Sequence, residues 1–403
     1  MVKEERLINP SRTIKRNLAL LASTQALLTI VVQTFVVHVP ITITALGGST
    51  TLAGLGTALM WGGRLATTYE MGSLMDRVGR MPVIMSGMAS MASTAAAAAI
   101  STDQTLMAAY LAVLIVFGVG RGMADYSRIA AGDMLPQERR GLGTGVLLSG
   151  SLVGNLAATP VVATVYAWAG EGNLAAIYYA VILFAFAGFV AAFAVRPDPL
   201  EIGRRYVERR DVDIGQSTHG ARSMRVLMTP AMVFAYVSSA MSTGVMVAFM
   251  SLGSLILHMH HINIAVISLV VTIYAFSIPL GKASDILGRV PVTAAGVVVC
   301  AVGAFISAVG VPLTVVTIGM FLIGVGWSAA TVGSIALISD ETEPSVRGKA
   351  LGFNDTAIAF ASLATPLIAS AVLEKLGAVA LGLTGLASAI PTLFLIIGLR
   401  RRA

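Results

Sequence analysis

The sequence predicts an all-α membrane protein with twelve transmembrane helices in two pseudo-symmetric bundles of six. Composition is the first observation: 56% of the 403 residues are hydrophobic and only 12% are charged, whereas a soluble protein is roughly a quarter charged. Internal repetition is the second, because the glycine- and arginine-containing stretch 72–83 recurs as 281–292. A chain this apolar needs lipid as the solvent for much of its surface, and the repeat indicates two related halves.

The apolar runs define the elements in order. A spanning helix needs roughly 20 mostly apolar residues, and such runs must be helical because lipid offers the backbone no hydrogen-bond partner. Twelve runs are expected, at about 17–44, 51–74, 82–101, 105–133, 142–168, 174–195, 228–257, 262–284, 291–310, 313–338, 350–373 and 378–399.

Basic residues occupy the loops on one side of these spans. The opposite loops hold Asp103, Glu171, Glu374 and a single lysine, Lys375. Because cytoplasmic loops are enriched in Lys and Arg, both termini are expected in the cytoplasm, with the chain in the plasma membrane.

The segment between spans six and seven differs in kind. Seven arginines and five acidic residues fall between Arg196 and Arg225, with little apolar periodicity. We expect residues 1–195 to form the first bundle, 196–227 a cytoplasmic linker and 228–403 the second bundle. The linker joins the halves, and a regulatory role is the alternative.

Several function classes are excluded or disfavoured. The net charge of +7 comes from short loops between apolar runs, which is a topology signal and argues against a nucleic-acid partner. Cys300 is the single cysteine, and the His258–His261 stretch has no companion carboxylate or cysteine, so no metal site is expected. The sequence has no phosphate-binding loop or nucleophile elbow, so we expect neither an enzyme nor a cofactor.

The two halves match beyond the first repeat. Gly118-Val119-Gly120 recurs as Gly324-Val325-Gly326, and Ala158-Thr159-Pro160 recurs as Ala364-Thr365-Pro366. With twelve spans and a long central loop, the chain resembles the major facilitator superfamily. Its loop 72–80 is similar to that family's signature Gly-x-x-x-Asp-Arg-x-Gly-Arg. The resemblance implies a monomeric transporter in which two parallel six-span repeats enclose a central substrate site.

The chain departs from two branches of that family. Thr159 stands where the helix-5 motif of antiporters has glycine before proline. No arginine precedes Gly118 where the drug/proton antiporters carry one. Membership of the drug-exporter branch is therefore not supported.

The repeated loops are the candidate cytoplasmic gate. Glycines allow a tight turn, and an aspartate can accept hydrogen bonds from arginine or from a neighbouring helix start. We expect a breakable latch, with a positive anchor plus a turn as the alternative. The residues assigned to it are Gly72, Asp76, Arg77, Gly79, Arg80, Arg140, Asp285, Arg289 and Arg347.

Ionisable groups at membrane depth are costly and each indicates a functional site. The second half has Trp327, Thr331 and Ser334 at the positions of Arg121, Asp125 and Arg128. The repeat therefore does not need these charges to fold. The deep charges are Arg64 and Glu70 on the second span, Arg121, Asp125 and Arg128 on the fourth, and Asp355 on the eleventh.

Helix rise predicts which of these charges can meet. At about 1.5 Å per residue, Glu70 and Arg128 lie at one depth and Arg64 and Asp125 at another. Because the resemblance makes the second and fourth spans neighbours, Glu70–Arg128 and Arg64–Asp125 can pair. Arg121 can also pair with Asp125 at i, i+4, and we expect Arg121 to carry the surplus charge.

The charges have two interpretations. A carboxylate that is alternately protonated and paired can couple protons to a substrate, with Glu70, Asp125 and the weaker candidate Asp355 in that role. The arginines Arg64, Arg121 and Arg128 would hold an anionic group. The alternative is a static network that ties two helices together.

Milder polar and aromatic residues complete the candidate substrate site. Each is expected either to line a cavity or to bond to a neighbouring helix. They are Gln25, Gln33, His38, Tyr126 and Trp327.

Together these features predict a secondary active transporter that moves a small amphipathic, anionic or zwitterionic organic solute by alternating access. Its partners would be the solute, protons or another coupling ion, and the bilayer, and the favoured mode is proton-coupled export. The alternatives are a uniporter or importer of a small organic anion, and a receptor or lipid scramblase on the same scaffold.

Overall fold

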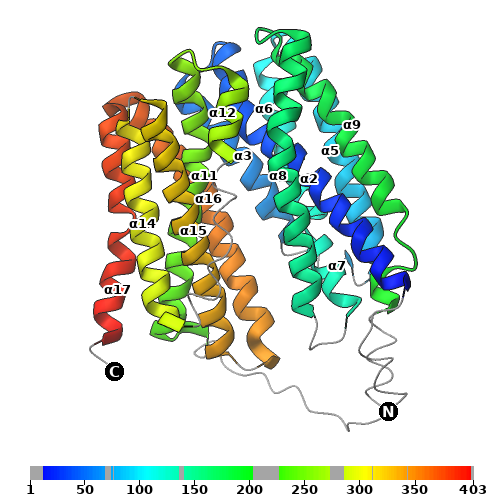
Figure 1. Cartoon of the computed structure of the whole chain (residues 1–403), viewed down its shortest axis with the longest axis vertical. Coiled ribbons are helices and arrows are strands. Elements are labelled where there is room, and N and C mark those ends of the chain that lie inside the picture. The colour runs from blue at the N-terminus through cyan, green and yellow to red at the C-terminus, as the bar shows by residue number, and fades with distance from the viewer. Residues whose placement is uncertain are drawn as a thin grey trace. The chain divides into compact units, whose positions relative to one another are not determined.

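The computed structural model describes residues 12–68, 74–75, 77–135, 140–202, 227–272, 286–310, 312–342 and 344–400, and within them the chain is helical with no strand (Figure 1). The helices are α2 (Arg12–Ala45), α3 (Thr50–Thr68), α5 (Arg80–Asp103), α6 (Met107–Ala124), α7 (Ser127–Asp133), α8 (Arg140–Ala169), α9 (Leu174–Phe193), α11 (Pro230–Met259), α12 (Ile264–Thr272), α14 (Arg289–Val309), α15 (Leu313–Glu341), α16 (Pro344–Ala387) and α17 (Ile390–Arg400).

The all-α membrane architecture expected from the sequence is confirmed. Nine stretches of the described residues are long and apolar enough to cross a membrane. The last of them, Val346–Ile397, holds two of the expected spans, because α16 turns at Gly377 (φ 81°). All twelve expected runs overlap a described helix, although the fourth, 105–133, is divided into α6 and α7.

Contacts between Cα atoms divide the chain into two compact units. Unit 1 holds the described residues of 1–35 and 63–218, and unit 2 those of 36–62 and 219–403. Residues 36–62 thus make their contacts with helices that follow them by nearly two hundred residues, as the Thr57–Ser251 pair shows. The helix α2 is unbroken across the boundary at Phe35.

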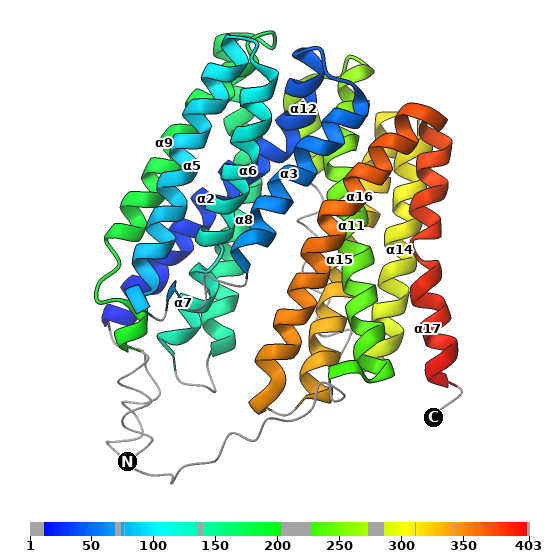
Figure 2. The same cartoon turned by 180° about the vertical axis from the view of Figure 1, so that it is seen from behind.

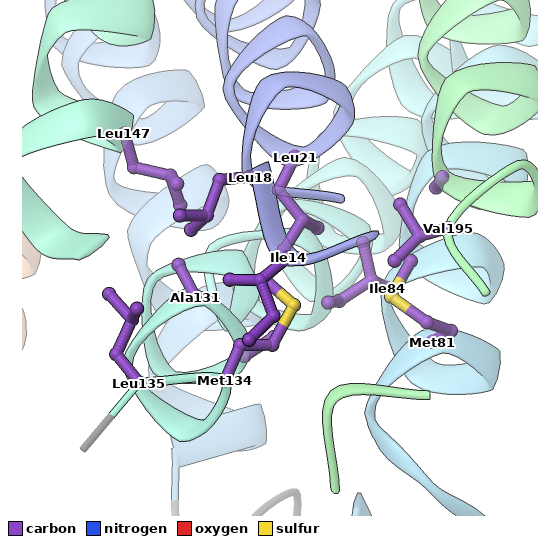
Figure 3. Close-up of a cluster of buried hydrophobic side chains, with 12 residues drawn as sticks. Ile14, Leu18, Leu21, Met81, Ile84, Ala131, Met134, Leu135, Leu147 and Val195 are labelled. Atoms are coloured by element: carbon purple, nitrogen blue, oxygen red, sulfur yellow. The ribbon is translucent and has the colours of Figure 1, made fainter. Parts of the chain in front are cut away.

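Unit 1 has an apolar cluster at the end where α2 begins (Figure 3). Ile14, Leu18 and Leu21 of α2 point into it. Side chains of α5, α7, α8 and α9, and of the residues just after α7 and α9, surround them, namely Met81, Ile84, Ala130, Ala131, Met134, Leu135, Leu147, Ala192 and Val195. This close packing holds α7 against α2 and so fixes the end of the fourth span.

Glycine contacts show the repeat in three dimensions. A Cβ on Gly87 of α5 would meet the Ala124 nitrogen and the Gly120 oxygen of α6, at 2.6 and 2.7 Å. In unit 2, a Cβ on Gly296 of α14 would meet Ala330 and Gly326 of α15 at 2.5 and 2.8 Å. Small residues allow backbones to approach closely in membranes, so each half keeps the same helix pair in contact by the same means.

Candidate functional site

The deep charges of the second and fourth spans meet in unit 1. Arg64 of α3 donates from Nε to Oδ2 of Asp125, at 2.9 Å. Arg121 of α6 reaches the same oxygen at 3.9 Å, and Arg128 also interacts electrostatically with this carboxylate. The side chains of Arg121 and Asp125 are each 16% exposed. We call Arg64, Arg121, Asp125 and Arg128 the charge cluster.

Close backbone approach positions the charge cluster. A Cβ on Gly122 of α6 would collide with Thr67 Oγ1 and would lie 3.3 Å from the Arg64 oxygen. A Cβ on Gly63 of α3 would collide with the Ile115 oxygen. Two glycines therefore bring α3 and α6 together close to the Arg64–Asp125 pair, one residue before Arg64 and three residues before Asp125.

The fourth span breaks at the charge cluster. The helix α6 ends at Ala124 and α7 begins at Ser127. Across the break, the backbone amides of Arg128 and Ile129 donate to the backbone carbonyl oxygens of Asp125 and Tyr126, three residues before them. Such a 3₁₀-type turn within a span often marks a hinge, and here it carries the buried carboxylate.

The structure brings together some of the expected charges and not others. Arg64 and Asp125 pair as their depths predict. Arg121 lies 3.9 Å from the same carboxylate, which is the i, i+4 pairing that the sequence allowed, and the expectation that Arg121 carries the surplus charge stays a prediction. Glu70 lies outside the described residues, and Asp355 is exposed on α16 in unit 2.

The polar candidates on α2 are buried. Gln25 is 2% exposed and accepts a hydrogen bond from Ser127 Oγ at 2.7 Å, which ties α2 to α7 beside the charge cluster. Gln33 is equally buried, and its Nε2 has no hydrogen-bond partner in the part of the chain that is described. His38 is fully buried and belongs to unit 2, and Tyr126 is half-buried at the break before α7.

Trp327 of α15 lies in unit 2 and is half-buried. Its Nε1 donates to Thr243 Oγ1 of α11 at 3.1 Å. Of the two expectations for Trp327, a hydrogen bond to a neighbouring helix is therefore present in the structure.

The described ends of the two repeated basic loops, where each leads into the next helix, have matching features. Gly79 (φ 100°) and Gly288 (φ 91°) lead into α5 and α14 in a conformation that favours glycine. The next residue, Arg80, pairs with Asp133 at 2.8 Å, and Arg289 pairs with Asp340 at 3.0 Å. Each arginine therefore joins the start of one span to the end of the span that follows it, α5 to α7 in unit 1 and α14 to α15 in unit 2.

The other gate candidates are placed in part. Arg77 is exposed, and Arg347 Nη2 donates to the Ser339 oxygen at the end of α15. Gly72, Asp76 and Asp285 lie outside the described residues, as does the side chain of Arg140.

Asp198 caps the helix that follows the first basic loop, and sequence reasoning missed it. Its carboxylate accepts from the backbone nitrogens of Arg80 and Met81, at 3.1 and 2.9 Å, and so caps α5. Asn17 of α2 donates to the adjacent Arg196 oxygen at 3.2 Å. An aspartate between two prolines directly after an apolar span was the available signal.

Unit 2 contains a second feature that the sequence did not predict. The far ends of α2 and α3 pack against α11 and α16 through short polar side chains. Thr57 and Ser251 hydroxyls lie 2.5 Å apart, Ser254 donates to the Val37 oxygen at 3.0 Å, and a Cβ on Gly54 would collide with Ser370. We call these contacts, together with the Thr51–Glu374 hydrogen bond, the seam.

The described residues contain no group of three His, Cys, Asp or Glu side chains arranged to hold a metal ion. The histidines His258, His260 and His261 lie at the end of α11.

Comparison with known proteins places the sequence among transporters. A model of the Major Facilitator Superfamily matches residues 21–253 and 232–403. Two proteins of Bacillus subtilis (strain 168), the uncharacterized MFS-type transporters YdeG and YddS, are 23% and 22% identical over 349 residues. The matches cover 84% of this chain and 81% and 80% of those proteins.

Solved structures share the fold. The human organic anion transporter MFSD10 matches with a TM-score of 0.66 at 16% identity, over 96% of this chain and 100% of that one. The peptide transporter POT in complex with sulfate gives 0.70 at 16% identity, over 96% and 95%. The inward-open xylose transporter XylE from E. coli gives 0.70 at 14% identity, over 93% and 95%.

Proposed function

The chain belongs to the Major Facilitator Superfamily, and we propose that this transporter, which is not an enzyme, moves a small amphipathic organic solute that carries a negative group. The observation that carries the proposal is the charge cluster, in which Arg64 and Arg121 lie within ion-pair distance of Asp125 and Arg128 adds a third positive charge near this carboxylate. Three arginines in one place at membrane depth would attract an anionic group on the solute. The human organic anion transporter and the sulfate-bound peptide transporter with the same fold are consistent with this choice.

We propose that Asp125 couples transport to protons. A solute carboxylate or sulfonate that engages Arg64 and Arg121 competes with Asp125 for the same guanidinium groups. When its partners are taken, the aspartate is a buried, uncompensated anion, which favours its protonation. Release of the solute restores the ion pair and expels the proton, so the solute and the proton bind together and leave together. This scheme carries both in the same direction, as in symport, rather than in exchange as in proton-coupled export.

The hinge beside Asp125 supports this exchange. The 3₁₀-type turn at residues 125–126 needs little further distortion to move the carboxylate relative to Arg64, because its hydrogen bonds are already displaced from the α-helical pattern. The Gln25–Ser127 hydrogen bond transmits the movement to α2.

We further propose that the basic loops form the cytoplasmic gate. Arg80–Asp133 and Arg289–Asp340 join equivalent helix ends, and Asp198 caps α5 at the same place. Their arginines belong to the loops that the positive-inside rule assigns to the cytoplasm. By the same rule we propose that both termini lie in the cytoplasm, with the protein in the plasma membrane.

The test uses purified protein in proteoliposomes loaded with a pH-sensitive dye. Gradients of gluconate and benzenesulfonate serve as probes, because both are anions that cross lipid slowly. We expect at least one gradient to drive proton movement, which Asp125→Asn reduces about tenfold or more and Asp125→Glu restores in part. The matched control is Asp103→Asn, which removes a carboxylate that only accepts from Tyr179 at the end of α5.

Unchanged proton movement in Asp125→Asn would contradict the coupling role. Flux of either anion without any proton movement in the wild type would instead indicate a uniporter, with the ion pair serving only to hold α3 against α6.

A further inference from the structure

Four basic side chains gather at the end of unit 1 where α2 begins. They are Arg12, Lys15 and Arg16 on α2, and Arg196 shortly after the end of α9, and all four are exposed. We call them the basic patch. Both views show the start of α2 beside the end of α9 (Figures 1 and 2).

Hydrogen bonds hold the two segments of the basic patch against each other. Arg16 Nη2 donates to the Arg196 oxygen at 2.5 Å. The Asn17 side chain, which is 0% exposed, donates from Nδ2 to the oxygens of Arg196 and Pro197 at 3.2 and 3.4 Å. The buried amide thus fixes the Arg196 backbone beside α2, so the fold brings together cations that are far apart in the sequence.

The positive charges of the basic patch are not neutralised within the part of the chain that the structure describes. The ion pairs found there all involve other side chains. Asp198, which follows Arg196 closely, accepts instead from the backbone nitrogens of Arg80 and Met81. Glu201 is exposed beyond it. Because neighbouring like charges repel each other, an anion bound at the patch would be stabilised.

An exposed apolar face continues from the patch along α9. Phe186, Val190 and Phe193 follow at intervals of four and three residues, hence on one face of the helix, and are 59, 48 and 51% exposed. The Arg196 guanidinium carbon lies 4.9 Å from the centre of the Phe193 ring, a favourable arrangement of a cation over an aromatic face. The basic patch therefore adjoins this apolar face directly.

The start of α2 has the same order of side chains. Its exposed positions also recur at intervals of three and four residues, namely Arg12, Arg16, Ala19 and Ser23. Ser23 donates its hydroxyl to the Ala19 oxygen at 3.0 Å, so this stretch can face lipid without an unpaired hydroxyl. The two helices meet farther along, where a Cβ on Gly188 of α9 would lie 3.5 Å from the Leu27 Cβ. Both helices are thus basic at one end and without charge beside it.

We propose that the basic patch binds the phosphate of an anionic phospholipid, whose acyl chains lie against the exposed faces of α9 and α2. Guanidinium groups match phosphate in charge and geometry, and each cation near a membrane surface favours an anionic lipid about fivefold. Only a lipid has chains to place along Phe186, Val190 and Phe193, which favours it over a free phosphate ester. All of these residues belong to unit 1, and none of them is in the charge cluster, so the inference is independent of the transported solute.

The test measures lipid binding to the purified full-length protein in detergent by native mass spectrometry. The probes are phosphatidylglycerol, which is anionic, and phosphatidylcholine with the same chains, which has no net charge. Glycerol 1-phosphate supplies a phosphate without chains. The variants are Arg12→Gln with Lys15→Gln, and separately Arg196→Gln. The matched control is Lys349→Gln with Lys375→Gln, which removes two exposed positive charges from unit 2.

We expect phosphatidylglycerol to bind the wild type about tenfold more tightly than phosphatidylcholine does, and the Arg12 and Lys15 variant to lose about tenfold of that affinity. Arg196→Gln should lose about fivefold. Phosphatidylcholine binding and the control variant should be unchanged. Because every substituted side chain is exposed, the variants should keep the wild-type unfolding temperature.

Three results would overturn the proposal. Equal phosphatidylglycerol affinity in the wild type and both patch variants would show that the patch is not the binding site. A loss in the control variant as large as in the double patch variant would show that only overall charge attracts the lipid. Displacement of phosphatidylglycerol by an equal concentration of glycerol 1-phosphate would show that the patch binds free phosphate esters rather than a lipid.

Discussion

At the scale of single residues, one carboxylate shared by several arginines is the distinctive feature of unit 1. Removing one partner from a buried ion pair costs roughly 3–5 kcal/mol, mostly because the other charge is left uncompensated. Asp125 therefore cannot leave Arg64 and Arg121 unless another anion or a proton takes its place. In the proposed function, this requirement is what makes the Arg64–Asp125 pair respond to an anionic ligand.

A second carboxylate, Glu374, predicts how the seam depends on pH. Glu374 lies beside the Gly377 turn, outside the expected spans, and accepts hydrogen bonds from the Thr51 hydroxyl and then the Thr51 amide. Both bonds lower the pKa of Glu374 below its ordinary value of 4.5. Because the folded-state pKa is lowered, the stabilisation is full above the ordinary value and is lost only as the pH falls through the lowered pKa.

The seam should therefore keep this hydrogen bond from neutral pH down to at least 4.5. The measurement is the labelling rate of a cysteine placed at Thr50, which keeps the Thr51 hydroxyl, in a Cys300→Ser background at a series of pH values with a pH-insensitive reagent. We expect the labelling rate to be independent of pH over that range. The same protein carrying Glu374→Gln, which has no carboxylate to titrate at this position, should also show no step. A step well above pH 4.5 would show that the carboxylate is protonated more easily than the contact implies.

At the scale of helices, glycine positions decide which charges meet. Gly122 allows α6 to lie against Thr67 and the Arg64 oxygen of α3. Gly63 of α3 likewise lies against the Ile115 oxygen of α6. Inserting side chains into such contacts costs about 1–3 kcal/mol, and the helices must separate to relieve the clash. The charge pair therefore depends on backbone approach as well as on the charges themselves.

Gly122→Val should lower the apparent melting temperature and weaken proton-linked transport together, since it pushes α6 away from Arg64. The matched control is Gly132→Ala in α7, where a Cβ would meet nothing within 4 Å. That change should be neutral or slightly stabilising, because alanine is favoured over glycine in a helix by about 0.5–1 kcal/mol. Thermal unfolding and the dye assay measure both effects, and a Gly122→Val protein with normal stability and coupling would contradict this role.

At this scale the sequence predicted some features and not others. Depth counting brought Arg64 to Asp125, because helix rise is constant and both residues lie in uninterrupted apolar runs. The break at residues 125–126 was missed, since no proline marks it and the hydrophobic pattern continues on both sides. The unpaired Nε2 of Gln33 was also missed, because whether a buried amide has a partner among the described residues depends on three-dimensional packing rather than on composition.

At the scale of the whole molecule, duplication explains what the two units share. The Gly87–Gly120 and Gly296–Gly326 contacts, and the Arg80–Asp133 and Arg289–Asp340 pairs, are equivalent in both. The repeated motifs predicted that Arg80 matches Arg289 and Gly120 matches Gly326, whereas the contacts and the ion-pair partners Asp133 and Asp340 came from the structure. The seam has no such signature, since short side chains such as Thr57 and Ser251 are common and only the fold reveals that they touch.

The contact units predict how the chain tolerates division. A fragment of residues 211–403 lacks 36–62, so Ser251, Ser254 and Ser370 lose their seam partners. We expect this fragment to be degraded when produced alone and to be stabilised by co-production of residues 1–210. The matched control is co-production of 1–210 carrying Gly54→Leu, which cannot fit against Ser370 and should rescue poorly. Equal levels of the fragment with and without its partner, measured by immunoblot of membranes, would contradict the contact units.

The seam also has a consequence for biogenesis. Val37 and Thr57 emerge from the ribosome 217 and 194 residues before the serines they contact. During that interval their polar groups are in the bilayer without their final partners, and contacts so distant in sequence are slow to form. The far ends of α2 and α3 are therefore synthesised early but reach their final contacts late. Until α11 and α16 have been synthesised, we expect a chaperone or the insertion machinery to protect them.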